Sequence, residues 1–428
     1  MTEIATAIHD PADAARLRDD LTNTLIADGW ITSPAVEAAF RRVPRHAFAP
    51  LGTTLEGAYA DDVIRTRFDP GGTCLSSMSA PWLQAAMIGQ AQVEPGMRVL
   101  EVGSGGYNAA LLAEVTGPDG HVVTIDIDPG VTDAAAAALG DAGYGDRVTV
   151  FTGDAEHGVP QHAPFDAIIV TAGAWDIAPA WISQLAPGSG TLVVPLRMNG
   201  WTRSIAFRKH GDHLASTSAQ VCGFVPMQGG GALVEQAAAF DVPGGGHILI
   251  RSEDPAFGDP PLPWDLLADG PVTAWSGITI ANMTSFADLY LWLGAFADGS
   301  CRVTAEDGNR LPCDADRPGR YPAAVIHDGS LACLITRKLS DADSEFGTCA
   351  YGPRADQAAA TLLRHISDWD CHDHDLPGTA FAYWPATTTP APVGPGPAGV
   401  FPKRHGTATI TWPSPHPAVQ TPAGRVGE

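Results

Sequence analysis

The chain has few basic residues and no apolar run long enough to cross a bilayer. Its 428 residues include 25 Lys and Arg against 48 Asp and Glu, a formal net charge of −23. A protein that binds a nucleic-acid backbone needs basic surface to neutralise phosphates, so this balance argues against a nucleic-acid partner. A transmembrane helix needs about 20 apolar residues in a row, so a membrane partner is not expected either. The acidity fits a basic peptide partner and a simple need for solubility equally well.

Cysteine pairs are also missing. The seven Cys residues are scattered and include no C-x-x-C pair, which argues against a disulfide framework and favours a reducing compartment. Residues 1–10 lack the basic start and apolar core of a signal peptide. We therefore expect a cytoplasmic protein. Its length and its 45% hydrophobic content allow a large core and two domains.

Residues 99–112 read VLEVGSGGYNAALL, a short apolar strand, a glycine turn and the start of a helix. Glycines let the backbone approach a ligand, and the helix start offers it free N–H groups. A second apolar run, 122–125, ends in Asp126. Such folds place a carboxylate for the ribose hydroxyls there, about 20 residues after the glycines. The pattern predicts a site for a nucleoside-containing cofactor.

A dinucleotide-binding fingerprint needs a third glycine that this loop lacks. Counting G-x-G-x-x-G from Gly103, the last position is Asn108. The pattern E-x-G-x-G that begins at Glu101 instead resembles the loop of S-adenosylmethionine (SAM) methyltransferases. The expected SAM-binding residues of this region are Glu101, Gly103, Ser104, Gly105 and Asp126. Two other interpretations stay open: a glycine turn without a ligand, and a Glu101 that only supports the loop.

Between residues 99 and 194, short apolar strands alternate with helical stretches. The expected strands are 99–102, 122–125, 148–151, 167–170 and 192–194. This alternation is typical of an α/β fold with a mostly parallel sheet and helices on both faces. Apolar alternation near 205–207 and 220–227 predicts antiparallel strands that close the same sheet. We expect residues 1–235 to form this domain.

The pattern changes after residue 235. Strand-like segments mix with two helical ones, at 286–296 and 356–366, so we expect a C-terminal α+β domain over residues 236–413. A stretch rich in Pro, Gly and Thr, 385–402, predicts an extended loop, after which 407–412 returns to a sheet. Residues 414–428 are expected to form a disordered tail.

Several motifs, in one order along residues 13–227, resemble the protein-L-isoaspartate O-methyltransferases. The segments that carry the resemblance are AAFRRVPRHAF (38–48), AYADD (58–62), SMSAP (77–81), GDA (153–155), PFDAIIVTA (164–172) and FVPM (224–227). The resemblance implies a Rossmann-like SAM-dependent methyltransferase that esterifies an Asp or isoaspartyl carboxylate of a peptide or protein. SAM is then the expected cofactor.

The resemblance also implies roles for individual residues. Ser79 becomes the candidate catalytic residue, because its hydroxyl can orient the substrate carboxylate. Its alternative role is the N-cap of a helix over residues 82–88. Asp154 is expected to accept from the adenine amino group, with backbone support from Ala155, unless it is only a turn residue. The expected substrate-binding residues are Ser77, Ser79 and Ala80.

Methyl transfer to a carboxylate needs no metal, and none is expected. The cluster at 371–375, with His365 upstream, does not have an established ligand spacing. The tryptophans that mark either a peptide groove or simply a core are Trp201, Trp264, Trp275 and Trp292.

Two features depart from the family pattern. The glycine loop is one residue shorter than is usual, and nearly 200 residues follow the matching region. This architecture looks like actinobacterial relatives encoded with ribosomal peptides such as lanthipeptides, which methylate an aspartate that then closes to an aspartimide and can hydrolyse to isoaspartate. That role is the first hypothesis, with peptide recognition assigned to residues 236–413. The alternatives are repair of isoaspartyl damage in proteins and, from another class, a non-catalytic peptide-binding scaffold.

Overall fold

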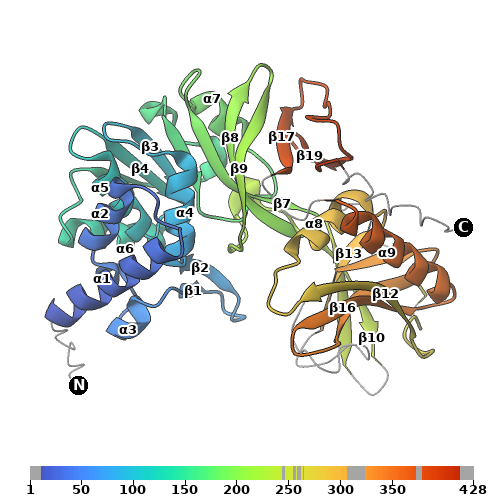
Figure 1. The fold of residues 1–428 in the computed structure, drawn as a ribbon. Coiled ribbons are helices and arrows are strands. Elements are labelled where there is room, and N and C mark those ends of the chain that lie inside the picture. Colours follow the sequence, from blue (N-terminus) through green and yellow to red (C-terminus); the bar gives the residue numbers. More distant parts are fainter. Residues whose placement is uncertain are drawn as a thin grey trace, which may run out of the picture.

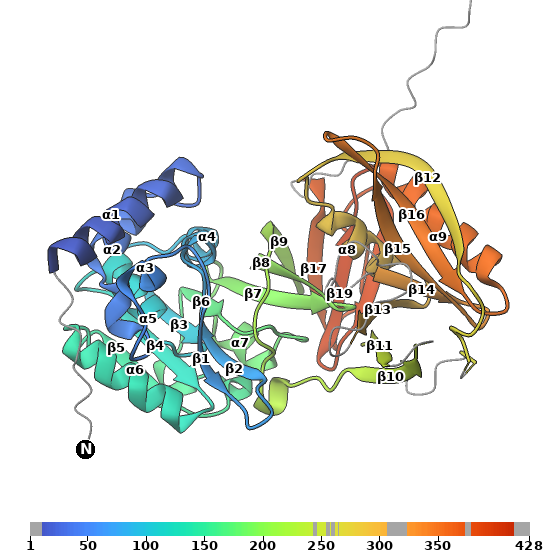
Figure 2. The same ribbon diagram turned by 90° about the horizontal axis from the view of Figure 1, so that it is seen from below.

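The computed structural model describes residues 11–242, 246–253, 257, 262–263, 265–305, 323–372 and 378–414. Their strands form a ten-stranded sheet, a seven-stranded sheet and a two-stranded hairpin (Figures 1 and 2). No helix in these ranges is both long and apolar enough to cross a membrane. Apart from its first residue, the tail expected at 414–428 lies outside the described residues.

Five neighbouring strands of the larger sheet are parallel. In spatial order they are β7 (Thr191–Met198), β6 (Ala167–Val170), β3 (Arg98–Val102), β4 (His121–Asp126) and β5 (Val148–Thr152). Every pair between them is parallel, and all but the edge strand β5, which is only partly buried, are buried almost throughout. Continuous apolar runs form such strands because both faces of the sheet are covered. The predicted α/β fold is confirmed.

The two faces of this sheet carry different partners. Val99 and Val122 belong to a core shared with one group of helices, whereas Leu100 and Val123 belong to a second core. This split follows from the alternation of side chains along a strand. The first group consists of α1 (Pro11–Ala27), α2 (Pro34–Arg42), α4 (Pro81–Ala91), α5 (Tyr107–Thr116) and α6 (Pro129–Asp141), and the second core holds α7 (Pro179–Gln184).

Two antiparallel strands, β8 (Trp201–His210) and β9 (His213–Val221), follow β7 in the sheet. The first overlaps the expected strand near 205–207. The second lies earlier than the expected 220–227, because the sheet pairing ends at Val221. Gly223 has no side chain to pack and the chain leaves the sheet there, after which Pro226 makes only an isolated bridge with Gly173.

The C-terminal half contains the antiparallel seven-stranded sheet. In spatial order its strands are β10 (Gln236–Asp241), β11 (His247–Ser252), β13 (Ser300–Ala305), β14 (Ala323–His327), β15 (Ser330–Lys338), β16 (Asp343–Tyr351) and β12 (Val272–Ala281). Helix α9 (Ala355–Asp370) packs on β12, β14, β15 and β16. Helices and antiparallel strands thus combine here as the sequence predicts.

The last three strands return to the first sheet. They are β17 (Ala380–Pro385), β19 (Gly406–Thr411) and β18 (Ala398–Pro402), and β17 pairs antiparallel with β9. Residues 236–413 therefore contribute strands to both sheets (Figure 1). The end of the expected loop at 385–402 is the edge strand β18, where a terminal proline is tolerated because its missing donor faces no partner.

Helix α8 (Ala287–Phe296) joins the two halves. It packs on β7 and β8 of one sheet and on β13 and β14 of the other. Its Trp292 meets Trp412 edge to face, with ring centroids 5.4 Å apart. One continuous apolar core contains Leu100 of β3, Trp181 of α7 and Ile366 of α9. The two halves are thus packed as one body.

Candidate cofactor and methyl-transfer site

An open cleft lies at the carboxyl ends of β3 and β4. Its lining includes the glycine loop, Asp126 and part of the hairpin formed by β1 (Ile64–Phe68) and β2 (Cys74–Met78). Ligands of open α/β sheets bind at this edge, where strand order changes direction. The cleft therefore lies where the sequence predicts a nucleoside site.

The glycine loop is shaped by its contact with Thr171. Gly103 has φ +100°, and a Cβ atom there would lie 2.4 Å from Thr171 Oγ1. That hydroxyl donates to the carbonyl of Val102 at 2.9 Å, which fixes the end of β3. At Gly105 a Cβ atom would meet nothing within 4 Å, so the loop is open on that side. Gly103 allows the turn, and Gly105 leaves room above it.

Ser104 and Asp126 present polar atoms to the cleft. The Ser104 residue is 1% exposed, and its hydroxyl has no hydrogen-bond partner among the described residues. The Asp126 carboxylate accepts from the Ser104 N–H at 3.1 Å and from the Asp128 N–H at 2.9 Å. These bonds fix the carboxylate while leaving lone pairs for a ligand. An orphaned hydroxyl beside a fixed carboxylate fits the polar part of a nucleoside cofactor such as SAM.

Glu101 lies behind the loop and does not line the cleft. Its carboxylate accepts from the Thr124 hydroxyl at 2.6 Å and the Asn108 amide at 2.9 Å. Burial raises the pKa of Glu101 to about 7, against the opposing effect of these two hydrogen bonds. Side-chain alternation turns Glu101 toward α5, so here it links β3, β4 and α5. This is the supporting role, made through side chains and not through the loop's N–H groups.

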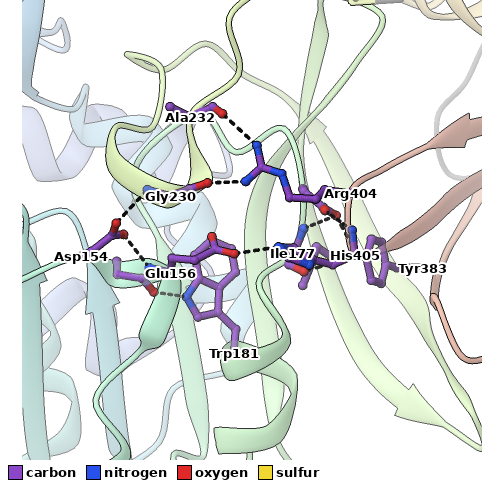
Figure 3. A network of polar contacts seen from close by, with 11 residues as sticks. Asp154, Glu156, Ile177, Trp181, Gly230, Ala232, Tyr383, Arg404 and His405 are labelled. Carbon is purple, nitrogen blue, oxygen red and sulfur yellow. Dashed lines mark hydrogen bonds and ion pairs between the residues drawn. The ribbon is translucent and has the colours of Figure 1, made fainter. Parts of the chain in front are cut away.

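Ala155 lines the cleft, whereas the neighbouring Asp154 does not. The two carboxylate oxygens of Asp154 accept from the Gly230 N–H at 2.7 Å and the Glu156 N–H at 3.0 Å. Asp154 thus caps the short helix η2 (Ala155–His157) and holds the glycine segment η4 (Gly229–Gly231) against it (Figure 3). In this structure it shapes the cleft wall through these contacts.

The expected substrate loop lies at the end of β2. Ser77 lines the cleft, whereas Ser79 and Ala80 are not among its lining residues. The Ser79 hydroxyl makes no hydrogen bond with the described residues. Ala80 is the N-cap of α4 and contributes no side-chain bond. The alternative role of Ser79 as the cap is therefore wrong. Asp61 performs that task, accepting from the Trp82 N–H at 2.9 Å.

Arg45, which was not among the expected site residues, holds this loop by a hydrogen bond to the Ser79 carbonyl. Its fully buried guanidinium donates to the Ala58 carbonyl at 2.8 Å, the Ser79 carbonyl at 3.1 Å and the Gln84 amide oxygen at 3.0 Å. Desolvation lowers the pKa of Arg45. It also lies over the ring of Tyr107, 5.1 Å from the centroid. The V-P-R-H segment contains this arginine but gives no sign of its partners, which lie 13 to 39 positions away.

Arg67 reaches from the hairpin across the cleft edge. Its Nε lies 2.7 Å from a carboxylate oxygen of Asp128, the residue that caps α6. Gln228 Nε2 donates to the Leu75 carbonyl at 3.4 Å from another side. Both contacts tie the hairpin to the body of the cofactor cleft. The sequence did not single out either residue.

The remaining candidates are the possible metal cluster at 371–375 and the tryptophans of the C-terminal half and of β8. No group of three His, Cys, Asp or Glu residues in the described part of the chain is arranged to hold a metal. Of the cluster at 371–375, residues 373–375 lie outside the described residues, and His372 packs on Trp292 at 4.9 Å. Trp275 lies beneath Arg337, Trp264 is outside the described residues, and Trp201 stacks on Tyr290.

Comparisons with known proteins match the N-terminal half. The family model described as Protein-L-isoaspartate(D-aspartate) O-methyltransferase (PCMT) matches residues 16–232. The protein-L-isoaspartate O-methyltransferase of Hyperthermus butylicus is 40% identical over 221 residues, 50% of this chain and 88% of the relative. That of Methanopyrus kandleri is 37% identical over 225 residues, 50% of this chain and 92% of the relative.

Two solved structures also align with this chain. A protein-L-isoaspartate O-methyltransferase structure aligns with a TM-score of 0.48 at 21% identity, covering 85% of this chain and 96% of its own. A Plasmodium falciparum structure titled as a putative enzyme of this type, in complex with S-adenosyl-L-homocysteine (SAH), aligns with a TM-score of 0.43 at 18% identity, covering 49% and 98%. From the family model and the sequence relatives, the chain belongs to the protein-L-isoaspartate O-methyltransferase family and is a SAM-dependent protein carboxyl O-methyltransferase.

Proposed function

We propose that this protein methylates the side-chain carboxylate of an isoaspartyl residue in a peptide or protein, and that the cleft at β3 and β4 is its site. The observation that carries the proposal is the composition of that cleft. The SAM-type loop with Asp126 and the serine-bearing end of β2 line the same space. Family membership supports the same reaction.

Methyl transfer to a carboxylate requires no proton transfer by the protein. A carboxylate is already ionised at neutral pH, so no general base is needed. SAM, when bound, supplies a methyl group on a positively charged sulfur. The chain must hold the two reactants about 3 Å apart and keep water out. We assign cofactor contacts to the cleft residues Gly103, Ser104, Gly105, Asp126 and Ala155. Glu101 and Asp154 do not line the cleft and support its walls through their hydrogen bonds.

The substrate carboxylate is assigned to the segment from Ser77 to Ala80. A serine hydroxyl orients a carboxylate oxygen by donating to it without transferring the proton. The Ser79 hydroxyl suits this role because no hydrogen bond ties it to the described residues and it follows the cleft residue Ser77 by two positions. The bonds from Arg45 and Asp61 keep this segment in place.

The test uses two peptides of one sequence, one with an isoaspartyl residue and one with normal aspartate. We expect labelled methyl to pass from SAM to the isoaspartyl peptide alone. Equal labelling of both peptides, or labelling of the aspartyl peptide only, would overturn the proposed selectivity. A control reaction with the Asp126→Ala variant checks that the label comes through this cleft.

A second candidate substrate is an aspartate in a modified ribosomal peptide, giving an ester that closes to an aspartimide. The observation that favours it is the C-terminal half, which lies outside the family match and, together with Trp201 of β8, lines a further groove. Its apolar lining comes from Trp201, Ile280, Met283, Phe286 and Tyr290. We propose that residues 236–413 recognise the peptide and that this groove receives its apolar side chains.

The groove proposal predicts a selective loss of peptide affinity. Met283 lines the groove and is fully exposed, so Met283→Glu places a charge there without disturbing the core. We expect the peptide KM to rise about fivefold, the equivalent of one lost apolar contact, with SAH affinity unchanged. The matched control is Leu339→Glu, an exposed apolar residue that does not line the groove. Equal peptide kinetics for both variants and wild type would contradict the assignment.

A further inference from the structure

The turn between β18 and β19 reaches the wall of the cofactor cleft, although it lies near the end of the chain. Lys403, Arg404 and His405 occupy this turn, more than 170 residues beyond the end of the family match at residue 232. Figure 3 shows Arg404 directed toward Gly230 of η4 and His405 directed toward Glu156 of η2. Strands β18 and β19, which lie outside the matched region, thus bring their connecting turn into contact with residues beside the cleft.

Arg404 clamps the glycine segment from the outside. One guanidinium nitrogen donates to the Gly230 carbonyl, and another donates to the Ala232 carbonyl at 3.3 Å. The Gly230 N–H is held on the opposite side by Asp154 at 2.7 Å. The backbone N–H and the backbone carbonyl of Gly230 are therefore both held, the first by Asp154 of the matched region and the second by Arg404 of the C-terminal strands.

The clamped segment shapes the cleft through its neighbours. Met227 and Gln228, which line the cleft, come immediately before it. A Cβ atom at Gly231 would lie 2.5 Å from Met227 Sδ, so this methionine packs directly against the segment. Three successive glycines have high backbone entropy when unrestrained, which makes external contacts necessary to hold one conformation.

His405 makes a second connection beside the first. Its Nε2 lies 2.8 Å from a carboxylate oxygen of Glu156, next to the cleft residue Ala155. The backbone N–H of His405 donates to one carboxylate oxygen of Asp176 at 2.7 Å. The Tyr383 hydroxyl donates to the other oxygen of that carboxylate at 2.6 Å. Strand β17 therefore supports the same wall through a buried carboxylate.

We propose that Arg404 and His405 are positioning residues of the SAM site, acting through Gly230 and Glu156 on the wall formed by Ala155, Met227 and Gln228. The C-terminal strands then complete the cofactor cleft of this chain. This inference rests on the cofactor site proposed above but not on the identity of the methylated peptide.

The test is calorimetric titration of SAH into the full-length protein and three variants, with kcat measured at saturating SAM. Arg404→Ala should raise the Kd for SAH about tenfold, the equivalent of the lost charged hydrogen bonds, while kcat and the melting temperature stay near wild type. Arg404→Lys, which can still donate to one carbonyl, should recover part of the affinity. Arg354→Ala is the matched control, because the exposed Arg354 side chain makes no hydrogen bond or ion pair with the described residues.

The outcomes separate this inference from the site assignment. If wild type fails to bind SAH, the proposed site itself is wrong. If wild type binds and Arg404→Ala binds equally well, the positioning role is wrong while the site assignment stands. If Arg404→Ala binds SAH more weakly but also melts well below wild type, and Arg404→Lys recovers none of the affinity, Arg404 only stabilises the fold. That result would overturn the inference as well. For His405, the corresponding pair is His405→Ala with His405→Gln, which keeps a donor for Glu156.

Discussion

Asp126 and Ser79 divide the proposed site into a part that binds the cofactor and a part that orients the substrate. The Asp126 carboxylate is held by two backbone N–H groups inside the cleft, ready to accept from hydroxyls. We predict that Asp126→Ala weakens SAH binding about tenfold to a hundredfold, the usual loss for a charged hydrogen-bonding group. Ser79→Ala should instead lower kcat about tenfold at nearly unchanged SAH affinity. Calorimetry with initial rates checks both, and equal effects on SAH binding would refute the division.

The raised pKa of Glu101 makes the free energy of unfolding depend on pH. Burial raises the pKa of Glu101 from its ordinary value of 4.5 to about 7 in the folded protein, so the folded state binds the proton more tightly than the unfolded state between these values. Its contribution to stability is full below pH 4.5 and is lost as the pH rises through 7. From pH 5 to pH 8, wild type should lose on the order of 2–3 kcal/mol relative to Glu101→Gln.

Denaturant unfolding of both proteins at several pH values measures this difference. The glutamine variant keeps an acceptor for Asn108 and is the isosteric control for packing. Parallel stability curves for the two proteins across this range would show that Glu101 does not titrate there. Because Glu101 does not line the cleft, SAH affinity should change little in the same variant.

Residues whose roles are local could be predicted from the sequence, and residues with distant partners could not. Gly103 and Asp126 were expected in the cleft because a strand, a turn and a following strand place them there, and both line it. Arg45 was missed as a structural centre because its partners lie 13 to 39 positions away. Asp61 likewise caps a helix from 21 positions upstream. No local pattern identifies such pairs.

At the scale of elements, Arg45 joins η1 (Arg45–Phe48), α3 (Leu55–Ala58) and the start of α4. Its removal leaves three backbone carbonyls and one side-chain amide oxygen without their donor. We predict that Arg45→Met lowers the free energy of unfolding by about 3–5 kcal/mol, because buried acceptors without partners are costly.

Arg42 provides the control for this prediction. Its side chain is 73% exposed and pairs with Glu114 at 3.4 Å. Arg42→Met should cost less than about 1 kcal/mol, as is usual for exposed ion pairs. Similar losses for the two variants in urea unfolding would contradict the role assigned to the buried arginine.

At the scale of the whole molecule, the two halves share a core and should unfold together. Trp412 is 1% exposed and packs edge to face with Trp292 of α8. We predict that Trp412→Ala costs about 3–5 kcal/mol and that the protein still unfolds in one calorimetric transition at a lower temperature. Val400→Ala, at a residue 55% exposed on the edge strand β18, is the control with little expected effect. Separate transitions for the two halves would show that the shared core does not couple them.

This arrangement is the part of the fold that the sequence could not supply. The pattern of strands and helices predicted an α/β half and an α+β half. It did not predict that β17 would pair with β9, which lies about 165 positions earlier. There Ala382 pairs with Ala215, and the Phe381 N–H donates to the Ser216 hydroxyl. Edge pairing at such separation depends on which surfaces the intervening sheet leaves uncovered, and that is a property of the folded molecule.

The central claim is that the cleft transfers a methyl group from SAM to a peptide carboxylate. Its most direct test is mass spectrometry of an isoaspartyl peptide after incubation with the full-length protein and SAM, followed by mild base. The account predicts a gain of one methyl group on the isoaspartyl residue, its release as methanol in base, and no gain with Asp126→Ala. A protein that binds SAH but adds no base-labile methyl group to either an isoaspartyl or an aspartyl peptide would contradict it.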